Sequence, residues 1–143
     1  MSEMIAKEYI ELISNLFGNF SQLNKEAVAL SHLQSHVLEF IYMKQRALNI
    51  KDISSGLDIA KQQLTKVISD LETGGFLVKA PDPKDKRAVL VSLTTAGKDA
   101  EDQKWAGMYQ RLSNNLTKLT DEEQADLTYA LHKVNLLLKK MEN

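Results

Sequence analysis

The chain has 143 residues, 43% of them hydrophobic, and it contains no cysteine. This length is sufficient for one domain with a buried core, and the lack of cysteine excludes disulfides, thiolate metal sites and thiol redox switches. The formal net charge is only −1, but residues 44–98 hold ten Lys or Arg against six Asp or Glu, whereas the remainder holds eight against thirteen. A basic centre between acidic ends favours a polyanionic partner for the middle of the chain.

The hydropathy of the chain predicts where the protein is found. No apolar run approaches the roughly 20 residues that a membrane-spanning helix needs. The first residues, with Glu3 and Glu8 among them, lack the pattern of a signal peptide. We therefore expect a cytoplasmic protein that does not contact a membrane.

Three helices are predicted in the first 57 residues. The first carries a wide apolar face at helical spacing. Ser31 and Gln34 form a capping box that begins the second helix. Asn49 can cap a short third helix that ends near Leu57, and the link of residues 56–59 has helix-turn-helix proportions. The apolar face of the first helix consists of Ile5, Tyr9, Leu12, Ile13, Leu16, Phe17 and Phe20.

Residues 61–71 predict a fourth helix with one apolar and one polar face. Its apolar residues recur at helical spacing, and Gly75 is a suitable left-handed residue after its end. The outer face offers amide, hydroxyl and ammonium groups, which can bind base edges and phosphates. A solvated amphipathic helix is the alternative interpretation. The buried face would hold Leu64, Val67, Ile68 and Leu71, and the outer face Gln62, Gln63, Thr65, Lys66 and Ser69.

A β-hairpin follows this helix. Residues 76–79 and 88–93 are rich in β-branched and apolar residues, and residues 81–87 between them hold both prolines of the chain. The loop also carries Lys84, Lys86 and Arg87, which suit a wing that reaches DNA. Ordinary solvated loop charges remain the alternative for the two lysines, and we expect Lys79 to be an ordinary exposed strand residue.

Two helices complete the chain. Thr94 or Thr95 can cap a long one, and the sequence from Thr120 to Glu123 is a capping box that begins the last. The apolar stripes of the first and last helices exceed what a small core can cover, so we expect them to pair with those of a second subunit. The stripe of the last helix consists of Leu127, Ala130, Leu131, Val134, Leu137, Leu138 and Met141.

Four short motifs in this order resemble the MarR family of winged helix-turn-helix transcriptional regulators. They are Leu30-Ser31-x-x-Gln34, Leu71-Glu72-x-x-Gly75-Phe76, Asp82-x-Lys84-Asp85-x-Arg87 and Leu93-Thr94-x-x-Gly97. The resemblance implies a mainly α fold with a small β wing and one domain over residues 1–143. Residues 31–97 would form the DNA-binding lobe, and residues 1–30 and 98–143 the dimerisation helices. It also implies a homodimeric regulator, usually a repressor, that binds an inverted-repeat operator and often responds to a small ligand.

The resemblance assigns roles to individual residues. Arg87 would enter the minor groove from the wing, with Asp85 bracing it, although Asp85 can also serve as a turn residue. In the major groove we expect contacts from Lys61, Gln62, Gln63, Thr65 and Lys66, and we expect further contacts from Lys84 and Lys86 on the wing. The chain departs from the family pattern at Asp58, where Gly is common, and at Ala60, where Ser or Thr commonly caps the recognition helix.

Other kinds of site receive less support. His32 and His36 have a spacing that can hold a metal, with His132 elsewhere, but no further ligand completes a set nearby, and we predict no metal and no cofactor. An aromatic or phenolic effector could bind Phe17, Phe20, Trp105, Met108 and Tyr109, although core packing is the favoured interpretation of such residues. No catalytic motif is present, so we expect no enzyme activity. A winged-helix module that binds protein instead of DNA is the alternative function.

Overall fold

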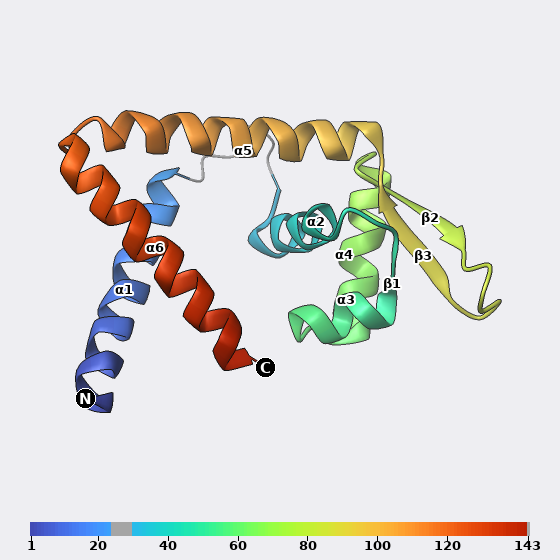
Figure 1. Cartoon of the computed structure of the whole chain (residues 1–143). Helices are drawn as coiled ribbons and strands as arrows, with labels where there is room; N and C mark the ends of the chain where they lie inside the picture. The colour runs from blue at the N-terminus through green and yellow to red at the C-terminus, as the bar shows by residue number, and fades with distance from the viewer. Residues whose placement is uncertain (24–29, 143) are drawn as a thin grey trace. The chain divides into compact units, whose positions relative to one another are not determined.

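The computed structural model describes residues 1–23 and 30–142, which are mainly helical with one small sheet (Figure 1). The chain divides into two compact units. One comprises Met1–Leu23 and Gly107–Asn143, and the other comprises Asn24–Ala106. We call the second the winged unit and describe each unit by itself.

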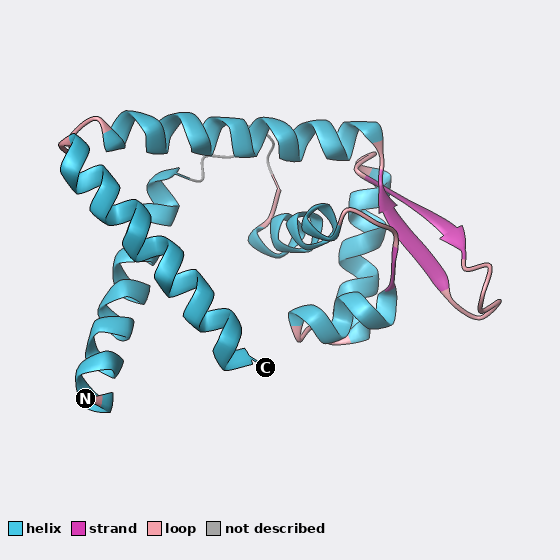
Figure 2. Ribbon diagram, viewed as in Figure 1, coloured by secondary structure: helices cyan, strands magenta, loops and turns pink. Residues whose placement is uncertain are grey.

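The winged unit holds three helices, a three-stranded sheet and the start of a fourth helix (Figure 2). The sheet is antiparallel with the strand order β1-β3-β2. A single core joins α2, α3 and α4 to the sheet. In chain order the elements are α2 (His32–Lys44), β1 (Leu48–Asn49), α3 (Ile50–Leu57), α4 (Lys61–Thr73), β2 (Leu77–Pro81), β3 (Val89–Leu93) and α5 (Thr95–Leu116).

Local capping explains where the helices of this unit begin and end. Ser31 and Gln34 form the predicted capping box, with the Gln34 N–H donating to Ser31 Oγ at 3.1 Å. The Asn49 side chain accepts a hydrogen bond from the Asp52 N–H at 2.8 Å, so it caps α3 as predicted. Asp58 has a left-handed backbone with φ 53°, and Gly75 follows α4 with φ 85°. The left-handed residue predicted after the helix is thus confirmed at Gly75, and Asp58 adopts the same conformation in the turn before α4.

The sheet differs from the prediction in three details. Pro81 was expected in the hairpin loop, but it is the last residue of β2 and pairs with Val89. The two-residue strand β1, which pairs with β3, was not predicted because two residues show no alternation. Lys79 is not an ordinary exposed residue: its ammonium lies 3.5 Å from Glu72 Oε1 and 3.4 Å from Ser69 Oγ. It therefore joins β2 to α4.

The first turns of α5 pack against α2 within the winged unit. Thr94 caps α5, because its Oγ1 accepts a hydrogen bond from the Gly97 N–H at 3.0 Å. Farther along, Lys104 is only 8% exposed, and its ammonium lies 3.3 Å from Glu39 Oε2. Residues 98–106, which the sequence analysis groups with the dimerisation helices, therefore belong to the same compact unit as the wing.

Asp102 on α5 is held by two donors. The Lys98 ammonium lies 2.7 Å from its Oδ2, and the Tyr42 hydroxyl donates to its Oδ1 at 2.6 Å. The hydrogen bond from Lys98, followed by that from Tyr42, holds the pKa of Asp102 below its ordinary value. Since the folded-state pKa is depressed, this interaction stabilises the fold above the unfolded pKa and is lost as the pH falls through the folded pKa.

We accordingly expect Asp102→Asn to lower the free energy of unfolding at neutral pH, because the amide cannot replace the carboxylate charge. The difference from wild type should stay constant down to about pH 5 and shrink below about pH 4, where the unfolded carboxylate takes up its proton. Urea unfolding followed by circular dichroism at several pH values measures this difference. Asp70→Asn is the control, since Asp70 is exposed on α4, and a difference that is the same at pH 6 and pH 3 would contradict the prediction.

The other unit contains α1 (Ser2–Leu23), the end of α5 and α6 (Asp121–Glu142). Thr120 and Glu123 form the predicted capping box of α6, with the Glu123 N–H donating to Thr120 Oγ1 at 3.2 Å. No residue of α6 is buried. Many large apolar side chains on these helices are exposed, among them Ile5, Ile10, Leu16, Phe17, Tyr109, Leu112, Leu131, Leu136, Leu137 and Met141.

Candidate nucleic-acid interface

The recognition helix α4 presents the predicted polar face. Its apolar residues Leu64, Ile68 and Leu71 are at most 1% exposed, so they fix the orientation of the helix. The Thr65 hydroxyl donates to the Lys61 carbonyl at 2.7 Å, which leaves its oxygen free to accept a further hydrogen bond. Ser69 is half-buried rather than fully outward. The side chains of Lys61, Gln62, Gln63, Thr65 and Lys66 are all exposed, as the predicted DNA contacts require.

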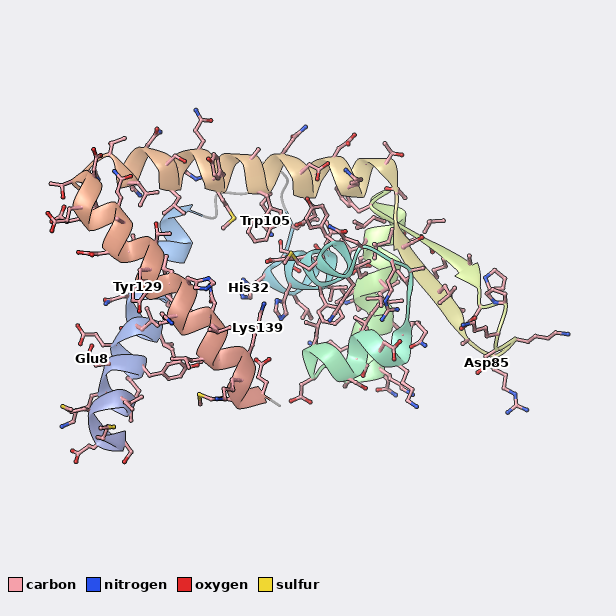
Figure 3. All side chains as sticks on the ribbon, in the orientation of Figure 1. Glu8, His32, Asp85, Trp105, Tyr129 and Lys139 are labelled. Carbon is pink, nitrogen blue, oxygen red and sulfur yellow. The ribbon has the colours of Figure 1, made fainter. Side chains whose placement is uncertain are left out.

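Two aspartates shape the tip of the wing. Asp82 Oδ1 accepts the Lys84 N–H at 2.9 Å, and Asp85 Oδ1 accepts the Arg87 N–H at 3.0 Å. The Asp82 N–H donates to the Ala88 carbonyl at 3.1 Å and closes the loop. Figure 3 shows Asp85 at the far end of the hairpin. Each carboxylate thus organises the main chain two residues ahead, as in an Asx turn.

In the free protein, Asp85 has the geometry of a turn residue. It accepts from the main-chain N–H of Arg87, and no ion pair joins it to the Arg87 guanidinium within residues 1–23 and 30–142. Asp85 therefore serves as a turn residue in the free protein, and its bracing of the Arg87 side chain on DNA stays a prediction. It braces the backbone that carries Arg87 and leaves the guanidinium exposed.

Among the described residues, the cations of the candidate interface form no ion pair, whereas three other lysines of the winged unit do. Lys79, Lys98 and Lys104 each form an ion pair with a carboxylate. No carboxylate of the described residues forms an ion pair with the cations of α4 and the wing, which are Lys61, Lys66, Lys84, Lys86 and Arg87. Unpaired, exposed cations on one helix and one loop are available to phosphate oxygens.

Sequence reasoning missed the role of Asp82, although a signal for it was present. Asp82 and Asp85 each stand two residues before a basic residue, in the pattern Asp-x-Lys and Asp-x-Arg. That spacing is typical of an aspartate whose side chain accepts a hydrogen bond from the main-chain N–H of the residue two positions later. Both aspartates are thus loop-forming residues that hold the basic side chains outward.

The recognition helix begins without a side-chain cap. Ala60 occupies the N-cap position with φ −58° and ψ 138°, and it makes no side-chain hydrogen bond to the helix.

We expect Ala60→Ser to raise the free energy of unfolding by about 0.5 to 1 kcal/mol, because a serine hydroxyl can accept a hydrogen bond from a main-chain N–H of the first turn. Urea denaturation measures the change. Ala106→Ser, an exposed position on α5, is the control, and equal effects of the two substitutions would contradict the capping argument.

The predicted effector residues are divided between the two units. Trp105 lies in the winged unit on α5 (Figure 3), and its indole N–H is buried without a hydrogen-bond partner among the described residues. Met108 is buried, whereas Phe17 and Tyr109 are each 75% exposed within a single chain. The side chain of Phe20 lies outside the described residues. The effector site remains a prediction.

His32 and His36 are exposed. Over residues 1–23 and 30–142, no group of three or more histidine or acidic side chains is arranged to hold a metal ion. In the same residues, no helix combines the length and the apolar character that crossing a membrane requires.

Comparison with known proteins places this geometry in a family. A family model described as a winged helix DNA-binding domain matches residues 30–97. The HTH-type transcriptional regulator YkoM of Bacillus subtilis is 34% identical over 140 residues, which cover 91% of this chain and 90% of that protein. The multiple antibiotic resistance protein MarR of Escherichia coli is 38% identical over 84 residues, 58% of each chain.

Solved structures agree with these sequence matches. Wild-type MarR from E. coli in its apo form superposes with a TM-score of 0.69 at 30% identity, over 87% of this chain and 94% of that one. The S. aureus protein MepR bound to ethidium bromide has the same fold, with a TM-score of 0.65 at 20% identity over 92% and 95% of the two chains. The exposed polar face of α4, the basic wing and these likenesses together show that the chain belongs to the MarR family of winged helix-turn-helix, DNA-binding transcriptional regulators.

Proposed function

We propose that this protein is a homodimeric repressor that binds an inverted-repeat operator and releases it when a small ligand binds. The observation that carries the proposal is the set of unpaired, exposed cations on α4 and the wing, beside the amide groups of Gln62 and Gln63. Amides can pair with adenine edges in the major groove, and a cation on a wing suits a narrow minor groove. A repressing role is supported by a relative from B. subtilis that is named the transcriptional repressor YetL, 22% identical over 135 residues.

The first experiment measures fluorescence anisotropy with a duplex from upstream of the protein's own gene and with a shuffled duplex, across a salt series. A sequence-specific regulator binds the native duplex more tightly, and this preference survives added salt better than the non-specific binding does. Equal weak binding to both duplexes, together with unchanged binding by Lys66→Ala and Arg87→Ala, would favour the protein-interaction module instead.

Dimerisation is supported by the apolar surface that the chain leaves uncovered on α1 and α6. None of the residues of α6 is buried, and exposed Leu131 and Leu137 lie on its predicted stripe. A monomeric protein rarely leaves so many large apolar side chains in water, and a second copy of the chain offers the same surface in return. Such a two-fold dimer presents two recognition helices, which suits operator half-sites about 10 bp apart.

We expect the protein to have twice the 16.1 kDa mass of one chain in solution. Replacing Leu131 and Leu137 together with glutamate should produce monomers, because the interface would then bury two unpaired carboxylates per subunit. Light scattering after size-exclusion chromatography measures the mass. Asn135→Glu is the control, since Asn135 is exposed and off the apolar stripe. A double variant that remains dimeric would refute this interface, and a nuclease footprint without two-fold symmetry would refute the inverted repeat.

Effector binding is supported by the buried indole N–H of Trp105, which has no partner among the described residues and can donate to a ligand. The aromatic residues Phe17 and Tyr109, exposed in the single chain, are further candidates for contacts with a ligand in the dimer. A ligand releases the operator only if it binds better to the conformation with the lower DNA affinity.

A further inference from the structure

The side chain of Lys79 crosses from β2 to α4. Its ammonium lies 3.5 Å from Glu72 Oε1 and donates a hydrogen bond to Ser69 Oγ at 3.4 Å. Glu72 and Ser69 are three residues apart on the helix, so their side chains occupy neighbouring positions on its surface. We call these three side chains the α4–β2 bridge.

The α4–β2 bridge holds the part of β2 that leads into the wing. Leu77, at the start of β2, is 2% exposed and belongs to the core. Lys79 is two residues onward, on the same face of the strand, and it is half-buried. The next two residues, Ala80 and Pro81, are exposed. Lys79 is therefore the last residue of β2 that is even partly covered by the winged unit.

The sheet gives this part of β2 support on one side only. β2 is an outer strand, whereas β3 pairs with both β2 and β1. Figure 1 shows the hairpin of β2 and β3 extending away from α4. Two-stranded ribbons vary widely in twist, so an anchor at one end of a hairpin leaves the direction of its tip adjustable. The contact that Lys79 makes with α4 is thus placed to fix that direction.

We propose that Lys79 is a positioning residue for DNA binding, which holds the wing at the angle to α4 that an operator half-site requires. The amides of α4 and the guanidinium of Arg87 are predicted to enter different grooves at the same time. Both contacts form without distortion only if the helix and the wing already lie at the correct angle, so a preformed angle raises the affinity. This role rests on the proposed function, because it concerns operator binding.

A direct contact with phosphate is the other role open to a lysine near DNA, and Glu72 separates the two roles. Glu72→Met removes the carboxylate that pairs with Lys79 and frees the ammonium. If Lys79 bound phosphate, this variant would bind DNA more tightly, since α4 would also lose a negative charge. If Lys79 positions the wing, the same variant binds more weakly. The two roles therefore predict changes of opposite sign.

Fluorescence anisotropy with the operator duplex and the full-length protein measures this sign. Lys79→Met and Glu72→Met should each weaken operator binding about threefold to tenfold, because a partly exposed ion pair holds its partners only weakly. The double variant should bind no more weakly than either single variant, since both substitutions remove the same contact. Lys79→Arg, which keeps the charge, should bind within about twofold of wild type.

Asp70→Asn is the control for charge. Asp70 is the other carboxylate of α4; it is exposed and forms no ion pair with any described residue. Its replacement should not weaken operator binding.

The direction of the wing can also be measured without DNA. Residual dipolar couplings of main-chain N–H groups report the direction of each bond in the free protein. The couplings of residues 80–88 should differ from wild type in Lys79→Met and Glu72→Met, whereas those of α4 should not. In Lys79→Arg and Asp70→Asn, both sets should match wild type. A residue that only added stability would leave the couplings of the folded protein unchanged.

These measurements separate the positioning role from the proposed function. The positioning role is overturned if Glu72→Met binds the operator as tightly as wild type or more tightly, or if the couplings of residues 80–88 stay unchanged in both variants. If no duplex binds specifically but these couplings change, the regulator proposal fails and the orientation of the wing by Lys79 stands. If the operator binds specifically and both variants bind it as wild type does, the regulator stands and the positioning role fails.

Discussion

Arg87→Ala is expected to weaken operator binding by roughly 30-fold or more while the fold stays intact. Truncation of one good DNA contact costs about 1 to 3 kcal/mol, and a homodimer loses one such contact in each half-site. The Arg87 side chain is exposed at the tip of the wing, and Asp85 holds its main-chain N–H. Its loss should therefore remove the predicted DNA contact without exposing any core residue.

Fluorescence anisotropy with the operator duplex measures this effect. The slope of the logarithm of the binding constant against the logarithm of the salt concentration should fall in magnitude by about one for each phosphate contact that is lost. Lys118→Ala is the matched control, since it removes one exposed positive charge between α5 and α6, outside the winged unit. If Arg87→Ala bound the operator as tightly as wild type, Arg87 on the wing would not be a DNA contact. A similar loss in Lys118→Ala would show that total charge, rather than a contact at the wing, sets the affinity.

Leu64→Ala should destabilise the winged unit by about 2 to 5 kcal/mol, because it leaves a cavity in the core beneath the recognition helix. Leu64 is 0% exposed and packs in the core cluster with Ile53, Ile68 and Leu77. Domains of this size are commonly only about 5 to 15 kcal/mol stable, so the loss would be a large share of the total.

Chemical denaturation followed by circular dichroism measures this loss. Gln63→Ala is the comparison at the adjacent position, where the side chain is exposed, and its free energy of unfolding should lie within about 0.5 kcal/mol of wild type. The two variants separate the faces of α4: Leu64→Ala lowers stability, whereas Gln63→Ala lowers operator affinity. A stable Leu64→Ala protein would contradict the packing described for this helix.

The helices of the fold could be predicted from the sequence because their caps and their apolar spacing agree. Ser31, Asn49 and Thr120 each accept the expected main-chain N–H, and the four apolar residues of α4 are buried as its periodicity indicates. Strand β1 could not be predicted, since two residues carry no period and its pairing with β3 depends on the folded core. The position of Pro81 in β2 likewise depends on its pairing with Val89, which the sequence does not display.

The exposure of the candidate site's side chains could be predicted from the sequence, but their ion pairs and hydrogen bonds could not. Composition identified the cations of α4 and the wing, whereas only the structure distinguishes them from Lys79, which Glu72 and Ser69 hold. Spacing also placed Phe17 and Tyr109 on apolar faces without indicating what covers them. Periodicity identifies a face that avoids water, and it does not say whether the same chain or another supplies the cover.

The start of α5 is fastened to the end of the recognition helix. The Thr94 N–H donates to the Phe76 carbonyl at 3.0 Å, and the Thr94 hydroxyl donates to the Gly75 carbonyl at 2.5 Å. Gly97 lies so close to the Phe76 carbonyl that any side chain at this position would collide with it. These contacts fix the backbone at Gly75 and Phe76. We therefore expect α4 and the first turn of α5 to move together as one rigid body. Asp102 and Lys104 also hold α5 to α2, so in a dimer the separation of the two recognition helices would follow from bending of α5 beyond residue 106.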